Sequence, residues 1–229
     1  MDISTCSSHF SPFTDNVRFS DNGPVSYEMP RPLENTSVSY ADFLYNGSEG
    51  SGGMLMGGVG QLVDRVKGIA ALDTDEGRFP WVGWATPPQQ IIFEFGRLQW
   101  FGSVTVHAYL NSPGVMWFGT VEVSISQNKE QWSTFSFGTD GLQGPQDITI
   151  PTQMNDGVAV EGRYVRLVFS DTQGSGPMLI SEVSFNSTVG KLQAYCPHPS
   201  DPFHVLYPIC FPISSLLQFL LHPHLHLHL

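Results

Sequence analysis

The chain reads Gly52-Gly-Met-Leu-Met-Gly-Gly-Val-Gly-Gln-Leu-Val-Asp-Arg-Val66 at its most distinctive point. Glycines let a backbone adopt positive φ and come close to another group. The stretch ends in oxygen donors, namely the side chains of Gln61 and Asp64 and the main-chain carbonyl of Val66. Amide, carboxylate and main-chain oxygens are the ligands that calcium prefers. The stretch therefore favours a loop packed around a calcium ion, with further ligands supplied from elsewhere in the chain.

The composition favours a β-rich extracellular domain. The chain has 229 residues, which is enough for one domain with tails. Its formal net charge of -11 argues against nucleic acid as a partner. Charged residues make up only 14% and aromatic residues 12%, beside 23 glycines and 17 prolines. Few charges with many aromatic and turn residues are typical of an all-β domain.

Short apolar or alternating segments follow one another through the middle of the chain. Thr120–Ser126 shows the alternation clearly, with Val121, Val123 and Ile125 on one face. The other predicted strands are residues 91–95, 103–109, 132–137, 147–150, 163–169 and 179–185. Because loops rich in Gly, Pro, Asn and Asp separate them, the pattern predicts a sandwich or barrel. We expect one or two helical turns at most, between Leu62 and Leu72.

The chain divides into three parts by composition. We expect residues 1–36 to be mostly irregular, either a linker or the end of a preceding domain, residues 37–190 to be the compact domain, and residues 191–229 to be a disordered Pro/His/Leu-rich tail. We expect neither a signal peptide nor a membrane span in this chain. An extracellular protein with this sequence would then be a fragment of a longer one.

Cysteines and glycosylation motifs bear on the compartment. The three cysteines are Cys6, Cys196 and Cys210, an odd number that leaves their pairing open. The N-glycosylation acceptor pattern begins at Asn35, Asn46 and Asn186. These three matches favour secretion.

Five segments of the chain occur in a familiar order. They are residues 57–64, Val82-Gly-Trp84, Ile92-Phe-Glu-Phe-Gly-Arg-Leu98, Val104-Thr-Val-His107 and Ile180-Ser-Glu-Val-Ser-Phe185. This order resembles the discoidin-like domain of the discoidin domain receptors, which are collagen-activated receptor tyrosine kinases. The resemblance covers about Tyr40 to Phe185, and Asn22-Gly-Pro-Val-Ser-Tyr27 is similar to the linker that leaves the preceding discoidin domain. It implies an all-β, eight-stranded jelly-roll sandwich of galactose-binding-like topology.

The resemblance also implies a calcium site that joins early and late parts of the chain. Its side-chain ligands would be Gln61, Asp64 and Glu182. Further oxygens, mostly from the main chain, would come from Val66, Phe79, Trp81 and Ser181. The family has an asparagine ahead of the glycine-rich stretch, and this chain has Ala41-Asp42 there, so Asp42 takes that place.

The chain departs from the family at its cysteines. Ala108 and Val123 stand where the family has cysteines, and the strand around Arg166 also lacks one. Losing a native disulfide costs about 2–5 kcal/mol. A calcium ion would therefore contribute more to the stability of this chain than to that of family members that keep these cysteines.

Other interpretations of the same residues remain open at this point. Gln61 and Asp64 also suit ordinary loop hydrogen bonds, and strand alternation alone would point Glu182 to solvent. A phosphate loop is a weak interpretation of the glycines, since no Lys-Ser/Thr follows them. The alternating histidines from His222 to His228 suit zinc or copper, although they lie in a biased tail. His107 lies in a predicted strand and suits packing better than catalysis.

The resemblance implies a non-catalytic extracellular module of a collagen-receptor tyrosine kinase. It would space or orient a neighbouring collagen-binding discoidin domain, which this chain lacks together with the kinase. The implied partners are that domain, collagen only indirectly, and a receptor dimer. A carbohydrate-binding, lectin-like module is the alternative, with Trp117 as the best exposed contact. No Gly-x-Ser-x-Gly elbow or paired carboxylates indicate an enzyme.

Overall fold

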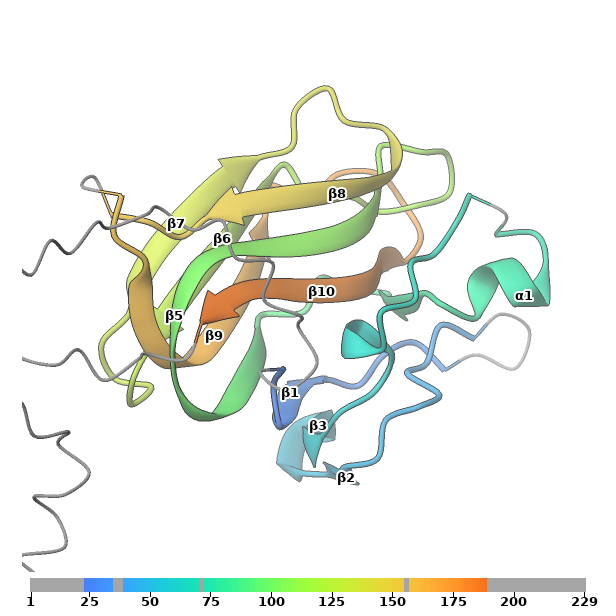
Figure 1. The fold of residues 1–229 in the computed structure, drawn as a ribbon. Helices are drawn as coiled ribbons and strands as arrows, with labels where there is room; N and C mark the ends of the chain where they lie inside the picture. The colour runs from blue at the N-terminus through green and yellow to red at the C-terminus, as the bar shows by residue number, and fades with distance from the viewer. Residues whose placement is uncertain (1–22, 35–38, 71, 155–156, 189–229) are drawn as a thin grey trace, which may run out of the picture. The chain divides into compact units, whose positions relative to one another are not determined.

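The protein's computed structural model describes residues 23–34, 39–70, 72–154 and 157–188 (Figure 1). These residues form an antiparallel β-sandwich, as predicted. The strands are β1 (Ser26–Pro30), β2 (Ser48–Glu49), β3 (Met54–Gly58), β4 (Val82–Trp84), β5 (Ile91–Leu110), β6 (Thr120–Ser126), β7 (Ser133–Gly138), β8 (Gly144–Pro151), β9 (Val160–Ser170) and β10 (Met178–Thr188). The described residues form ten strands rather than the expected eight. β1 to β4 lie outside the segments in which the sequence pattern predicted strands.

The strands form two layers that share β5. One layer has the order β2-β3-β1-β5-β9-β6-β7, and β8, β5, β10 and β4 form the other. The first part of β5 pairs with β1 and β9, and from Ser103 onward it pairs with β8 and β10. Figure 1 shows β5 curling from one layer to the other. Residues 91–95 and 103–109 are therefore one bent strand, because the exposed residues 96–98 interrupt the apolar pattern but not the strand.

The core between the layers is rich in phenylalanine. Phe95 lies 4.9 Å from Phe101 and 5.1 Å from Phe185, measured between ring centroids. Phe93 is also 5.1 Å from Phe185. All four rings are buried, and their near edge-to-face arrangement is favourable for aromatic pairs. β5 and β10 are thus joined by side chains as well as by backbone hydrogen bonds.

The compact unit begins earlier than the sequence suggested. β1 pairs with β3 and β5, and its Tyr27 and Met29 are buried in the core. The expectation of an irregular linker is therefore wrong for residues 26–30. A five-residue strand between turn residues gives a weak sequence signal, and partner strands more than twenty residues away stabilise it. Residues 1–22, the tail 189–229, all three cysteines and the terminal histidines lie outside the described residues.

Helical structure is limited to three short turns in the described part of the chain: η1 (Ser51–Gly53), η2 (Gln61–Val63) and α1 (Asp75–Arg78). The expected helical turn between Leu62 and Leu72 is only the end of η2. α1 lies instead in the acidic loop that follows. Thr74 is the N-cap residue of α1. Its hydroxyl accepts a hydrogen bond from the Gly77 N–H at 3.0 Å and so caps the first turn.

Candidate functional site

Glu182 is buried by a loop that covers the outer face of β10. Val183 and Phe185 face the core, whereas Glu182 pairs with His107 on the opposite face of the strand. The register between β10 and β5 shifts between Ile180 and Glu182, so Ile180 also faces the core and Ser181 lies on the outer side with Glu182. Both residues are nevertheless buried, with 0% and 5% of their surfaces exposed. The carboxylate that the calcium hypothesis requires is therefore enclosed between β10 and a covering segment.

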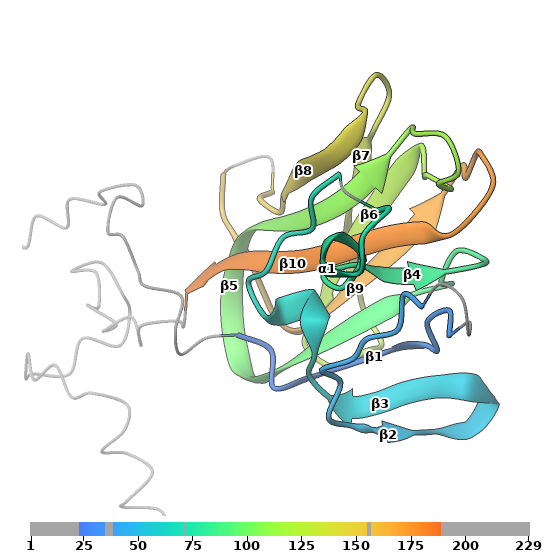
Figure 2. The ribbon, with the colours of Figure 1, turned by 90° about the vertical axis from the view of Figure 1, so that its right-hand side faces the viewer.

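The loop after η2 lies over this part of β10. The main-chain N–H of Arg65 donates to Oε2 of Glu182 at 2.9 Å, and the N–H of Gly68 donates to the Ser181 hydroxyl at 3.0 Å. Asp64 accepts a hydrogen bond from the Val66 N–H at 2.8 Å, which closes a local turn. Figure 2 shows the chain from η2 to α1 lying across β10. Asp64, Ser181 and Glu182 therefore lie at the same contact between this loop and β10.

Burial and the nearby charge of Asp64 raise the cost of ionising Glu182. Burial raises the pKa of Glu182 to about 8, and the negative charge of Asp64 contributes to this rise. Burial also raises the pKa of Asp64. A bound cation would remove this cost, because an opposite charge favours the ionised form of a carboxyl group. The electrostatics of this pair therefore fit a metal ion.

Gln61 and Asp42 form the other half of the site. Gln61 is fully buried, and its side-chain oxygen accepts from the Phe43 N–H at 2.6 Å while its amide group donates to the Phe79 carbonyl. Asp42 accepts from the Gln61 N–H at 2.8 Å and from the Tyr27 hydroxyl. Burial raises the pKa of Asp42, and Asp64 adds to the rise. Asp42 is thus close enough to Asp64 for the two charges to interact.

Trp81 contributes a wall to the site. Its indole is buried, donates to the Ile69 carbonyl at 3.1 Å and stacks on His107 with 5.6 Å between ring centroids. His107 lies between the Asp147 carboxylate at 2.7 Å and the Gly68 carbonyl at 3.0 Å. Its ring therefore ties the loop to β5 and β8, in the packing role expected from the sequence.

The described residues contain no group of three or more His, Cys, Asp or Glu side chains that could hold a metal ion. The predicted site relies instead on two central carboxylates and on neutral oxygens. An amide oxygen such as that of Gln61 has a second lone pair after it accepts one hydrogen bond. The donor set of carboxylate, amide, hydroxyl and main-chain oxygen fits calcium.

Trp117 does not form an exposed contact. It is partly buried and packs against the main core. Its main-chain N–H donates to the Gln173 carbonyl at 3.0 Å. Its neighbours pair with the loop before β10 through two isolated bridges, Met116 with Met178 and Trp117 with Gln173. The expectation of an exposed tryptophan there is wrong, because a distant loop covers it.

Residues 23–187 match the family model of the discoidin domain-containing receptor 1/2, DS-like domain. The chain belongs to this family. The match begins just before β1 and ends within β10, so the DS-like domain coincides with the sandwich. No curated protein sequence matches the chain.

Among solved structures, the DS-like domain is similar to CpGH89CBM32-6 of Clostridium perfringens, at 13% identity over 71% of this chain and 92% of that one, with a TM-score of 0.39. It is also similar to the C-terminal domain of a chitobiase from Bacteroides fragilis, at 18% identity over 46% of this chain and 66% of that one, with a TM-score of 0.34. Likeness at this level says nothing about what the DS-like domain binds.

The DS-like domain exposes two of the three glycosylation motifs. Asn46 and Asn186 are exposed, whereas Asn35 lies outside the described residues. The Asn46 side-chain oxygen accepts from the Val59 N–H at 2.9 Å. Glycosylation at these positions stays a prediction. No helix of the described residues is long and apolar enough to cross a membrane.

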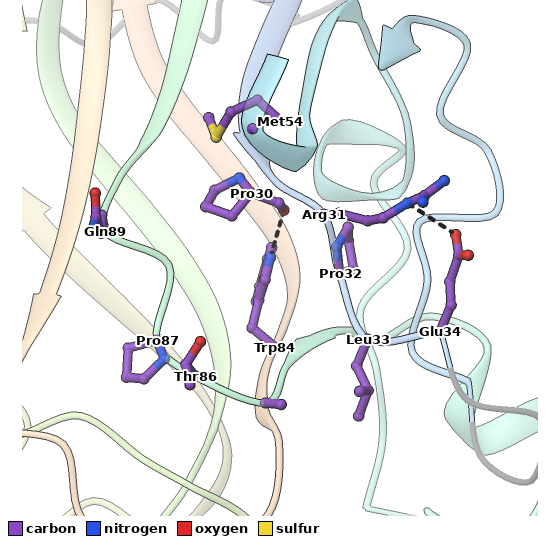
Figure 3. Close-up of a pocket in the computed structure, with 12 residues that line it drawn as sticks. Pro30, Arg31, Pro32, Leu33, Glu34, Met54, Trp84, Thr86, Pro87 and Gln89 are labelled. Atoms are coloured by element: carbon purple, nitrogen blue, oxygen red, sulfur yellow. Dashed lines mark hydrogen bonds and ion pairs between the residues drawn. The ribbon is translucent and has the colours of Figure 1, made fainter. Parts of the chain in front are cut away.

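A pocket of about 620 Å³ opens between the end of β1, the start of β3 and the loop after β4 (Figure 3). Its apolar lining includes Pro30, Met54, Trp84 and Pro87. The Trp84 indole donates to the Pro30 carbonyl at 2.8 Å, so two walls of the pocket are fixed to each other. Nothing in the sequence patterns pointed to this pocket, because its walls come from three separate segments.

Proposed function

We propose that this chain is a non-catalytic, calcium-binding DS-like module from the extracellular part of a collagen-receptor tyrosine kinase. It would orient a neighbouring collagen-binding discoidin domain at the cell surface, within a receptor dimer. The family match supports the receptor context. The observation that carries the calcium role is the meeting of Asp64 and Glu182, two carboxylates whose pKa values are raised at the contact between a loop and β10.

The bound ion would neutralise these carboxylates. Asp64 and Glu182 would hold it together with the amide oxygen of Gln61, the Ser181 hydroxyl and main-chain oxygens near Val66 and Phe79. These residues join the loop after η2 to β10. An ion bound among them would stabilise this contact, which links residues more than a hundred positions apart in the sequence. Closing a long loop restrains the unfolded chain, and binding to the folded state alone adds directly to stability.

Calorimetric titration and thermal unfolding with calcium or a chelator test this role. Saturating calcium is expected to raise the melting temperature, since a free concentration one hundred times Kd stabilises by about 2.7 kcal/mol. Glu182→Gln should lose most of this rise. Glu76→Gln is the matched control, because Glu76 is an exposed carboxylate on α1. Equal melting curves with calcium and chelator in the unmodified protein would refute the calcium role.

The orienting role predicts a division of labour between domains. Residues 23–188 alone should bind triple-helical collagen peptides poorly, because collagen contact is assigned to the neighbouring domain. Surface plasmon resonance on immobilised triple-helical peptides measures this directly. Tight, saturable binding by the isolated module would overturn the orienting role and leave the calcium role intact.

A carbohydrate-binding module is the second candidate, and the pocket in Figure 3 favours it. Its floor is apolar, and at its rim Arg31 lies 3.8 Å from a Glu34 carboxylate oxygen and 3.3 Å from one of Glu49. An apolar floor suits the carbon face of a sugar ring, and the charged side chains at the rim suit its hydroxyl groups. A glycan array with the unmodified protein and Gln89→Ala tests this candidate. Hits that Gln89→Ala leaves unchanged would assign sugar binding to another surface.

A further inference from the structure

Tyr27 connects β1 to the proposed calcium site. Its ring is 1% exposed, and its hydroxyl donates to Oδ2 of Asp42, which lies in the loop between β1 and β2. The other carboxylate oxygen of Asp42 accepts from the Gln61 N–H at 2.8 Å. One buried carboxylate therefore joins β1 to the residue that begins η2.

A second tyrosine strengthens this connection. The Tyr45 hydroxyl donates to the Tyr27 carbonyl at 2.7 Å and accepts from the Gly58 N–H at 3.1 Å. The rings of Tyr27 and Tyr45 lie 5.2 Å apart. The Asp42 side chain is also confined by Gly60, since a Cβ there would come within 2.3 Å of its Oδ1. The carboxylate is thus held by Tyr27 on β1 and by Gly60 and Gln61 at the start of η2.

Gln61 carries the connection onward. Its side chain accepts from the Phe43 N–H and donates to the Phe79 carbonyl. Phe43 and Phe79 are about half exposed, and their rings stack with centroids 5.5 Å apart and planes 8° apart. The orientation of Gln61 therefore depends on Asp42 at its main chain and sets the positions of two surface residues through its side chain.

We propose that Tyr27 and Asp42 are positioning residues that couple β1 to the calcium site, so that calcium binding fixes the strand through which the preceding chain enters the module. The inference rests on the proposed calcium-binding function. Asp42 acts here through Gln61 and Tyr27, because its Oδ1 accepts from the Gln61 N–H and its Oδ2 accepts from the Tyr27 hydroxyl. Calcium that orders Gln61 would stabilise the Asp42–Tyr27 contact and with it the pairing of β1 against β3 and β5.

Amide hydrogen exchange with calcium or a chelator tests the coupling. In the unmodified protein, calcium is expected to slow amide exchange about tenfold both in residues 64–70 and in β1. Residues that contact one another open together, so stabilising the site also stabilises the strand that is hydrogen-bonded to it. Tyr27→Phe should retain the slowing in residues 64–70 and lose it in β1. A calcium effect on β1 that survives Tyr27→Phe would overturn the coupling. No calcium effect in either segment of the unmodified protein would refute the calcium function itself.

Two further variants separate positioning from general packing. Tyr109→Phe is the matched control, since Tyr109 is also a buried tyrosine and its hydroxyl forms no hydrogen bond within the described residues. It should leave the calcium response of β1 unchanged. Asp42→Asn should also retain the response, because an amide accepts from Gln61 and donates to the Tyr27 oxygen, whereas Asp42→Ala should lose it. Equal loss in Asp42→Asn and Asp42→Ala would contradict the hydrogen-bonded link.

Discussion

The main-chain N–H of Arg65 donates a hydrogen bond to the carboxylate of Glu182 at 2.9 Å, although the two residues lie 117 positions apart. Arg65 has a φ of 71°, in the left-handed region that non-glycine residues seldom adopt. The loop after η2 therefore turns sharply at the point where it meets β10. This contact closes the glycine-rich stretch against the last strand and places Asp64 next to Glu182.

The raised pKa of Glu182 predicts a specific pH dependence for the calcium-free protein. The folded carboxyl group holds its proton up to about pH 8, whereas the unfolded one releases it near its ordinary value of 4.5. Between these values the folded state binds more protons, so its stability falls as pH rises, by at most ~1.4 kcal/mol per pH unit from this group. Below pH 4.5 and above pH 8 this group contributes no slope. Urea unfolding in chelator across this range measures the slope.

Glu182→Gln and calcium provide the controls for that experiment. The substitution should flatten the slope, because a glutamine does not titrate. Saturating calcium should also remove it, because the bound ion keeps the carboxylate ionised in the folded protein. The stabilisation by calcium should therefore grow from pH 5 to pH 8. A calcium-free stability that rises with pH through this window would contradict the assigned burial of Glu182.

Gly60→Ala should weaken the site without changing any ligand. A Cβ at Gly60 would lie 2.3 Å from Oδ1 of Asp42, which must then move away from the Gln61 N–H. We expect a loss of about 1–3 kcal/mol from overpacking and a weaker calcium response. Gly23→Ala is the control, since nothing lies within 4 Å of its Cβ position. Identical unfolding curves for the two variants would show that Asp42 has room to move.

Phe95→Ala should be among the most damaging single changes in the core. Phe95 is fully buried and contacts the rings of Phe101 and Phe185. Truncation of a buried phenylalanine costs about 3–5 kcal/mol. Phe137→Ala on β7 is the comparison, because Phe137 is 37% exposed. Urea denaturation should separate the two variants clearly, and similar losses would argue against the described packing of β5 on β10.

Thr74→Ala tests whether α1 depends on its cap. The Thr74 hydroxyl accepts from the Gly77 N–H at the first turn of α1. Losing such a cap costs about 1 kcal/mol. The four-residue helix should fray, and faster amide exchange in residues 75–79 measures this. Exchange that is unchanged there would mean that tertiary contacts alone hold the turn.

Local sequence determined the identity of most strands. Alternation marked β6 and β9 because one face of each strand is buried in the core and carries apolar residues, whereas the other is mostly polar. The resemblance to the discoidin domain receptors indicated Gln61, Asp64 and Glu182, and the structure brings Asp64 and Glu182 together. These features depend on residue type and spacing, which the sequence states directly.

The tertiary structure alone decided β1, the burial of Glu182 and the partial burial of Trp117. β1 is too short to be marked by its own pattern and is held by β3 and β5. Glu182 lies on the outer face of β10 and is buried only because the loop after η2, more than a hundred positions away, covers it. Trp117 is covered by the loop near Gln173, more than fifty positions away. Sequence states what each segment prefers, but burial depends on which distant segment packs against it, and only the folded chain determines that.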